Sequence, residues 1–155
     1  MNAVAIDLDA LGDTQSLWRA WLEDAARRFA AIAALDPVSL PRDRAAAAAQ
    51  LDAWAARGVG DWHAALARFA EDHAALHLRR DPEVGAALRR LAGARIGVFT
   101  DAPEPLARVA LAQLGATRHV GAVETGAGAF DRVRQRLGPH AAVVRTRAEL
   151  LRLRD

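Results

Sequence analysis

Two acidic residues separated by one position are the first candidates for chemistry in this sequence. Residues 2–8 form a short apolar run that ends in acid, which is typical of a buried parallel strand. Because open α/β sheets place their sites at the carboxyl ends of strands, we expect Asp7 and Asp9 at such an end, on one side of an extended chain. There they repel each other unless a divalent cation or an arginine neutralises them. The alternative interpretation is a pair of surface aspartates that end a strand.

A hydroxyl at the end of a later strand is the second candidate. The run from Ile96 to Thr100 is apolar up to its last residue, and a helix is expected to begin at Pro103. The free backbone amides at the start of that helix suit an anion, and Thr100 would lie beside them. The alternative is that Thr100 only ends the strand or caps the turn.

The remaining sequence predicts the elements that position these residues. Helical periodicity over 14–80 predicts helices from Thr14 to a break at 36–41, over 42–57 and over 61–78, and a further helix opens at Asp81. After Gly93, strands at 94–100, 119–123 and 140–144 alternate with helices at 103–114, 129–137 and 148–154. Such alternation predicts an α/β fold with a parallel sheet of about four strands. We expect residues 1–13 and 81–155 to form this core and residues 14–80 to form an all-helical insertion after the first strand.

The order of these features resembles the haloacid-dehalogenase-like hydrolase superfamily, in its phosphatase branch with a helical cap inserted after the first motif. The similarity lies in Asp7-Leu8-Asp9, about 70 helical residues, the segment Gly-Val-Phe-Thr-Asp-Ala-Pro at 97–103, and a helix that ends in Leu-Ala-Gln-Leu-Gly-Ala. The resemblance implies a Rossmann-like core in which Asp7 is the nucleophile that forms an aspartyl-phosphate. It also implies Asp9 as general acid/base, Thr100 as a hydrogen-bond donor to phosphate, and Mg²⁺ held at Asp7 and Asp9.

The third and fourth motifs of that family are degenerate here. All 21 basic residues are arginine, so no lysine is present to clamp a phosphate, and Arg132 is a possible substitute. The strand at 140–144 runs into Arg145 instead of the acids that would complete a magnesium site. We therefore predict Arg145 within salt-bridge reach of Asp7 or Asp9, replacing the charge of the metal. The alternative is an ordinary solvated Arg145.

Two functional hypotheses follow from these matches and departures. The favoured one is a catalytically impaired or non-catalytic member that needs no cofactor and acts through a protein partner. The alternative is a Mg²⁺-dependent phosphatase that hydrolyses a small phosphorylated metabolite through an aspartyl-phosphate on Asp7. All four tryptophans fall within 14–80, where they fill a unit otherwise built of alanine, line a substrate pocket, or form a homodimer interface through the cap.

Composition narrows the class of protein further. The 155 residues carry a formal charge of only +2 and contain no cysteine, so a cysteine nucleophile and a disulfide are excluded. Positive and negative charges are nearly equal in number, and no aromatic residues are interspersed in the arginine-rich segments. These features predict that the protein has no nucleic-acid partner. No apolar run reaches the roughly 20 residues of a membrane span, and the first residues lack the features of a signal peptide. We expect a cytoplasmic protein with no membrane contact.

Overall fold

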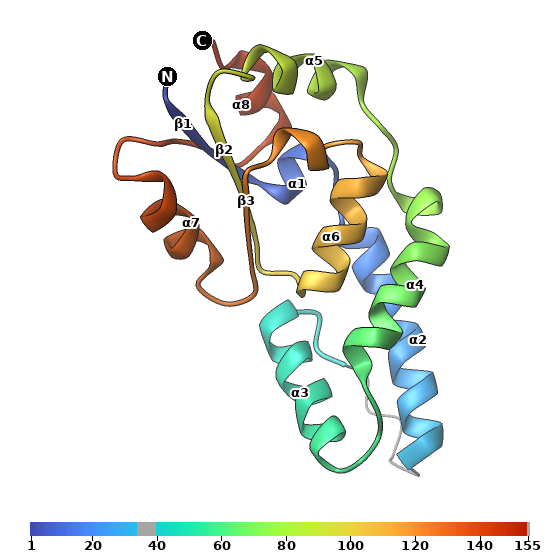
Figure 1. Cartoon of the computed structure of the whole chain (residues 1–155). Helices are drawn as coiled ribbons and strands as arrows, with labels where there is room; N and C mark the ends of the chain where they lie inside the picture. The colour runs from blue at the N-terminus through green and yellow to red at the C-terminus, as the bar shows by residue number, and fades with distance from the viewer. Residues whose placement is uncertain (34–39, 155) are drawn as a thin grey trace.

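The computed structural model describes residues 1–33 and 40–154 and is drawn in Figure 1. The predicted helix break at 36–41 falls largely outside this part of the chain. The described residues form four strands and eight α-helices. In chain order these are β1 (Ala3–Asp7), α1 (Leu8–Leu11), α2 (Gln15–Ala33), α3 (Arg44–Ala56), α4 (Trp62–His77), α5 (Pro82–Arg90), β2 (Arg95–Thr100), α6 (Glu104–Gln113), β3 (Ala122–Thr125), α7 (Ala129–Leu137), β4 (Ala142–Val144) and α8 (Arg147–Arg152).

The sheet confirms the predicted α/β class. Its four strands are all parallel and lie in the order β3-β2-β1-β4. In the register of the sheet Asp7 lies opposite Phe99, and Thr100 lies opposite Thr125. The central strand β1 is almost fully buried, as expected for a parallel strand covered on both faces. The carboxyl ends of all four strands therefore meet at one edge.

The two faces of the sheet are covered unequally. Figure 1 shows α7 on one side, and its Val133 and Leu137 pack with Ala5 and Phe99 in a small apolar cluster. The other face packs against α1, α5, α6 and α8 in a much larger apolar cluster. Gly97 allows the close approach of α7, because a Cβ there would lie 2.6 Å from Cγ2 of Val133.

Helices α2, α3 and α4 follow β1 in the chain and continue the larger cluster. Aspartate side chains cap two of them: Asp43 accepts from the backbone N–H of Ala46, and Asp61 accepts from His63 and Ala64. The tryptophans are all buried, which confirms that they fill the interior of this unit: Trp18, Trp21, Trp54 and Trp62. Because their cluster is continuous with the sheet face, the described residues show no separate apolar core at the expected boundaries near 13 and 80, and that division stays a prediction.

Three local predictions are wrong in detail. The first strand ends at Asp7, because its carboxylate accepts the backbone N–H of Asp9 and starts the short helix α1. Asp9 therefore lies on a helix and not on extended chain. Residues 117–119 form a 3₁₀ turn, so β3 begins at Ala122 instead of His119. The last helix begins one residue early, at Arg147, because the Thr146 hydroxyl accepts from the backbone N–H of Glu149. No helix of the described residues is long and apolar enough to cross a membrane.

Candidate functional site

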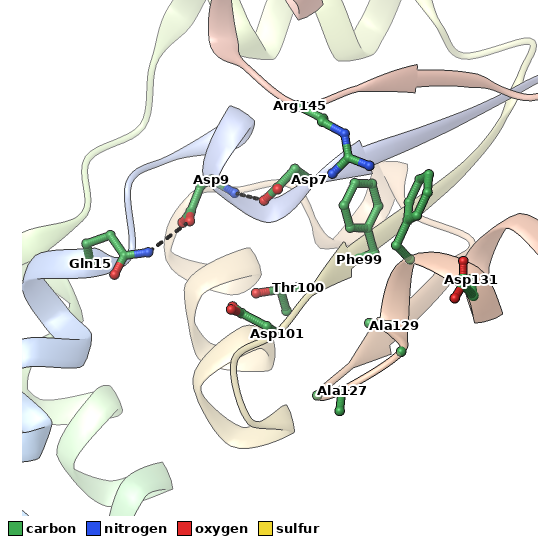
Figure 2. Close-up of a pocket in the computed structure, with 13 residues that line it drawn as sticks. Asp7, Asp9, Gln15, Phe99, Thr100, Asp101, Ala127, Ala129, Asp131 and Arg145 are labelled. Carbon is green, nitrogen blue, oxygen red and sulfur yellow. Dashed lines mark hydrogen bonds between the residues drawn. The ribbon is translucent and has the colours of Figure 1, made fainter. Parts of the chain in front are cut away.

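Asp7 lies at the carboxyl end of β1, half-buried, in a cavity at the edge of the sheet (Figure 2). Its Oδ1 accepts a 2.9 Å hydrogen bond from the backbone N–H of Asp9. Burial raises the pKa of the Asp7 carboxyl above its usual value, and the negative charges of Asp9 and Asp101 add to that effect. The hydrogen bond from Asp9 and the charge of Arg145 oppose the rise in pKa without cancelling it.

The carboxylate of Asp9 points away from Asp7, toward the start of α2 (Figure 2). Its Oδ1 accepts from both the backbone N–H of Thr14, at 3.0 Å, and the Thr14 hydroxyl, at 2.6 Å. Its Oδ2 lies 3.4 Å from the side-chain nitrogen of Gln15. Asp7 and Asp9 are thus only two residues apart in the chain, but their carboxylates have different neighbours.

The cation that pairs with Asp9 is Arg44, which sequence reasoning missed. Arg44 is the first residue of α3, and only 3% of its side chain is exposed. Its Nη2 donates a 2.8 Å hydrogen bond to the Thr14 hydroxyl and lies 3.6 Å from Oδ2 of Asp9. Its Nε lies 3.5 Å from Oδ1 of Asp101, and its Nη1 lies 3.5 Å from the Thr100 hydroxyl oxygen.

These contacts make Arg44 the charge that neutralises the two acids on either side of it. A buried guanidinium is tolerated only when it is paired and hydrogen-bonded, and Asp9 and Asp101 supply the pairing. Nothing in the local sequence shows that Arg44 points inward, because it begins a run of alanines with little amphipathic contrast. The one available signal is Asp43 before it, which marks where the helix starts.

Thr100 is brought to the site as predicted, and it is 4% exposed. Its hydroxyl oxygen accepts the backbone N–H of Ala102 at 3.1 Å and faces Arg44. This is the arrangement of a side chain that caps the turn between β2 and α6. The hydroxyl proton is still available to a ligand, since both contacts use the oxygen as an acceptor.

The predicted ion pair of Arg145 is wrong, although its position is close to the one expected. Arg145 follows β4, which pairs with β1, and it lines the same cavity as Asp7. Among the described residues no carboxylate oxygen lies within 4.0 Å of its guanidinium. The guanidinium carbon instead lies 4.5 Å from the ring centre of Phe130 and 5.5 Å from that of Phe99. Two aromatic faces attract the cation, and Asp9 is already paired with Arg44.

Arg132, the other predicted phosphate or carboxylate partner, contacts a different acid. Its Nε lies 3.0 Å from Oε2 of Glu124, and its Nη1 donates to the carbonyl oxygen of Ala127 at 2.7 Å. A further N–H donates to the carbonyl oxygen of Thr125. Arg132 therefore stabilises the loop between β3 and α7 by hydrogen bonds to its backbone. It is not among the residues that line the cavity.

The cavity itself has a volume of about 350 Å³ and an acidic lining. Four aspartates and a single arginine contribute to its wall, together with the glycine-containing loop before α7. The lining residues are Asp7, Asp9, Gln15, Phe99, Thr100, Asp101, Gly126, Ala127, Gly128, Ala129, Phe130, Asp131 and Arg145. An anionic ligand would meet net negative charge here, which Coulomb repulsion disfavours.

The donor set does not fit a magnesium ion. Within residues 1–33 and 40–154, no three side chains of histidine, cysteine, aspartate or glutamate lie close enough together to hold a metal ion. Mg²⁺ needs near-octahedral oxygen ligands, whereas Asp7 and Asp9 direct their carboxylates to different neighbours. Comparisons of the chain with family models, with curated proteins and with solved structures returned no match.

Proposed function

We propose that this chain is a haloacid-dehalogenase-like protein whose hydrolytic site has become a non-catalytic binding pocket. In this proposal residues 1–13 and 81–155 form a Rossmann-like core, and residues 14–80 form a helical cap. The observation that carries it is the buried guanidinium of Arg44, which reaches from the first turn of α3 to Asp9 and Asp101. An internal cation there stabilises the acids without a metal.

The surroundings of Asp9 support the loss of acid/base chemistry. A general acid or base must lie within hydrogen-bond reach of the group whose proton it moves. Both oxygens of Asp9 already have partners, in Thr14, Gln15 and Arg44, and of these three only Gln15 lines the cavity. Its carboxylate is therefore turned from the place where Asp7 would meet a substrate.

The charges around Asp7 oppose attack on a phosphate ester. A phosphoryl group carries negative charge that an enzyme neutralises with metal ions, lysine or arginine. The cavity presents Asp7, Asp101 and Asp131 to such a group, while Arg145 is held against two aromatic rings. The lining favours a neutral or cationic small ligand over a phosphate ester. Contact with a protein partner, and a homodimer formed through the cap, also remain part of the proposal.

A hydrolysis assay tests this proposal against the alternative of a Mg²⁺-dependent phosphatase. The wild-type chain, Asp7→Asn and the control Asp72→Asn are incubated with p-nitrophenyl phosphate and Mg²⁺. Asp72 is exposed on α4 and undergoes the same chemical change far from the cavity. We expect all three to release nitrophenol at the background rate. Hydrolysis that requires Mg²⁺, persists in Asp72→Asn and disappears in Asp7→Asn would overturn the proposal.

A further inference from the structure

A second cavity lies at the opposite edge of the sheet from Asp7. It has a volume of about 400 Å³ and is bounded by the first residues of β2 and β3, the 3₁₀ turn before β3, and the end of α7. Figure 1 shows that the strands run from this edge toward α3, so the two cavities lie at opposite ends of the strands. Its charged and titratable lining residues are all basic: Arg95, Arg118, His119 and Arg136.

The arginines of this cavity have little compensation from carboxylates. Arg136 pairs with Oε1 of Glu124 at 3.0 Å, an acid that it shares with Arg132. The Nη2 of Arg95 donates to the carbonyl oxygen of Leu137 at 3.0 Å. Within the described residues, neither Arg95 nor Arg118 has a carboxylate in salt-bridge range. Most of their N–H groups are thus available to a ligand.

The neighbouring His119 is also affected by the local excess of positive charge. Nε of Arg118 donates to Nε2 of His119 at 3.3 Å, which requires that this ring nitrogen carry no proton. Burial lowers the pKa of His119, and the charges of Arg118 and Arg89 lower it further. A chain with a net charge of only +2 therefore gathers unbalanced cations around this one cavity.

We propose that this cavity binds a compact phosphate-bearing anion, with Arg95 and Arg118 as its principal ligands. Guanidinium groups present paired N–H donors that match the oxygens of a phosphate. The size of the cavity suits a small molecule, and Val120 and Leu137 provide apolar wall beside the cations. This site shares no residue with the cavity at Asp7, so its occupation is independent of the function proposed there.

Calorimetric titration of the full chain with inorganic phosphate and with pyrophosphate tests the proposal. We compare the wild type with Arg95→Gln and Arg118→Gln, and use Arg68→Gln as a control for the loss of one exposed charge. The loss of a charge-assisted hydrogen bond is expected to weaken binding about tenfold in each cavity variant. Binding to Arg68→Gln and to Asp7→Asn should match the wild type. Circular dichroism establishes that each variant is folded.

A nuclear magnetic resonance titration of His119, at constant ionic strength, supplies a second readout within the cavity itself. A bound anion favours the protonated imidazole, so saturating phosphate should raise the pKa of His119. The proposal is overturned if neither anion binds saturably, or if Arg68→Gln weakens binding as much as Arg118→Gln. It is equally overturned if Asp7→Asn changes the affinity and the cavity variants leave it unchanged, because the anion would then bind at the other edge.

Discussion

The side chain of Arg44 pairs with two of the acids at the carboxyl edge of the sheet, Asp9 and Asp101. It donates one short hydrogen bond, to the Thr14 hydroxyl at 2.8 Å, and lies between Asp9 and Asp101 at longer distances. Its guanidinium also lies 5.8 Å from the ring centre of Trp18. One residue of α3 therefore links α1, through Asp9, to the turn after β2, through Asp101.

Replacement of Arg44 by Met should destabilise the fold. Met retains much of the buried volume but leaves the hydroxyl of Thr14 without its donor and Asp9 without its cation. We expect the free energy of unfolding to fall by about 2–3 kcal/mol, less than for a pair buried on both sides because the two aspartates are partly exposed. Urea denaturation measures the change, and Arg68→Met, at an exposed position of α4, should stay within about 0.5 kcal/mol of wild type. Equal stability of the two variants would contradict this role.

Asp7 should make the fold less stable as its carboxyl ionises. Its pKa is raised in the folded chain, so the folded state holds this proton at pH values where the unfolded state has lost it. Stability therefore falls as pH rises above 3.8, the ordinary value of the group, through the folded pKa. Asp7→Asn keeps an acceptor for the N–H of Asp9 and should raise the free energy of unfolding near pH 7 but not well below 3.8. Urea curves at both pH values test the sign, and a variant less stable than wild type near pH 7 would refute it.

Part of this site could be predicted from the sequence, and the contacts of Arg145 and Arg44 could not, for physical reasons. Asp7, Asp9 and Thr100 gather as expected because carboxyl ends of parallel strands share an edge. Arg145 follows a strand of the same sheet, so it lines the same cavity. Its guanidinium packs against the ring of Phe130, and no local sequence pattern predicts where that ring points. Arg44 acts on residues 30 and 56 positions away in the chain, and spacing carries no information about such a contact.

At the level of elements, long periodic segments were predictable and short ones were not. Helices of 9–19 residues and the buried strands β1 and β2 lie within a few residues of their expected bounds. Helix α1 has only 4 residues, too few for periodicity to appear. The strand β3 has just 4 residues after a 3₁₀ turn, and hydrophobicity alone placed it too early. Tertiary contacts decide such short segments.

The contact between α7 and the sheet should depend on Gly97. A Cβ at this position would lie 2.6 Å from Cγ2 of Val133 and 3.0 Å from Cδ1 of Leu137. Gly97→Ala should therefore push α7 outward and lower the free energy of unfolding by about 1–3 kcal/mol. Gly93→Ala is the matched control, because a Cβ there meets no atom within 4 Å. Chemical denaturation that shows the two variants to be equally stable would contradict this packing.

One large apolar cluster joins the sheet to α2, α3 and α4, and a small second cluster lies between the sheet and α7. The large cluster joins buried residues of β1, such as Val4 and Ile6, to Leu106 of α6 and to the tryptophans of α2, α3 and α4. A small domain with one core is expected to unfold in a single cooperative step. The division of the chain at residues 13 and 80 would then describe the order of elements along the chain and not two separate folding units.

Denaturation followed by two probes tests that cooperativity. Tryptophan fluorescence reports only on residues 18–62, because all four tryptophans lie there, while far-ultraviolet circular dichroism reports on every helix. We expect the two urea transitions to coincide in midpoint and slope. A fluorescence transition at clearly lower urea would show that α2, α3 and α4 unfold before the sheet.

The two ends of the strands carry opposite charge: the carboxyl ends are lined by aspartates and the amino ends by arginines. We propose that Arg44 takes the place of a metal at the carboxyl ends, beside Asp9 and Asp101, and in the described part of the chain no three metal-ligating side chains lie together. The most direct test is nuclear magnetic resonance of the wild-type chain with equimolar Mn²⁺, a paramagnetic stand-in for Mg²⁺. Our account predicts no selective broadening of the backbone amides of Asp7 and Asp9. Selective broadening of these amides that excess Mg²⁺ reverses would contradict it.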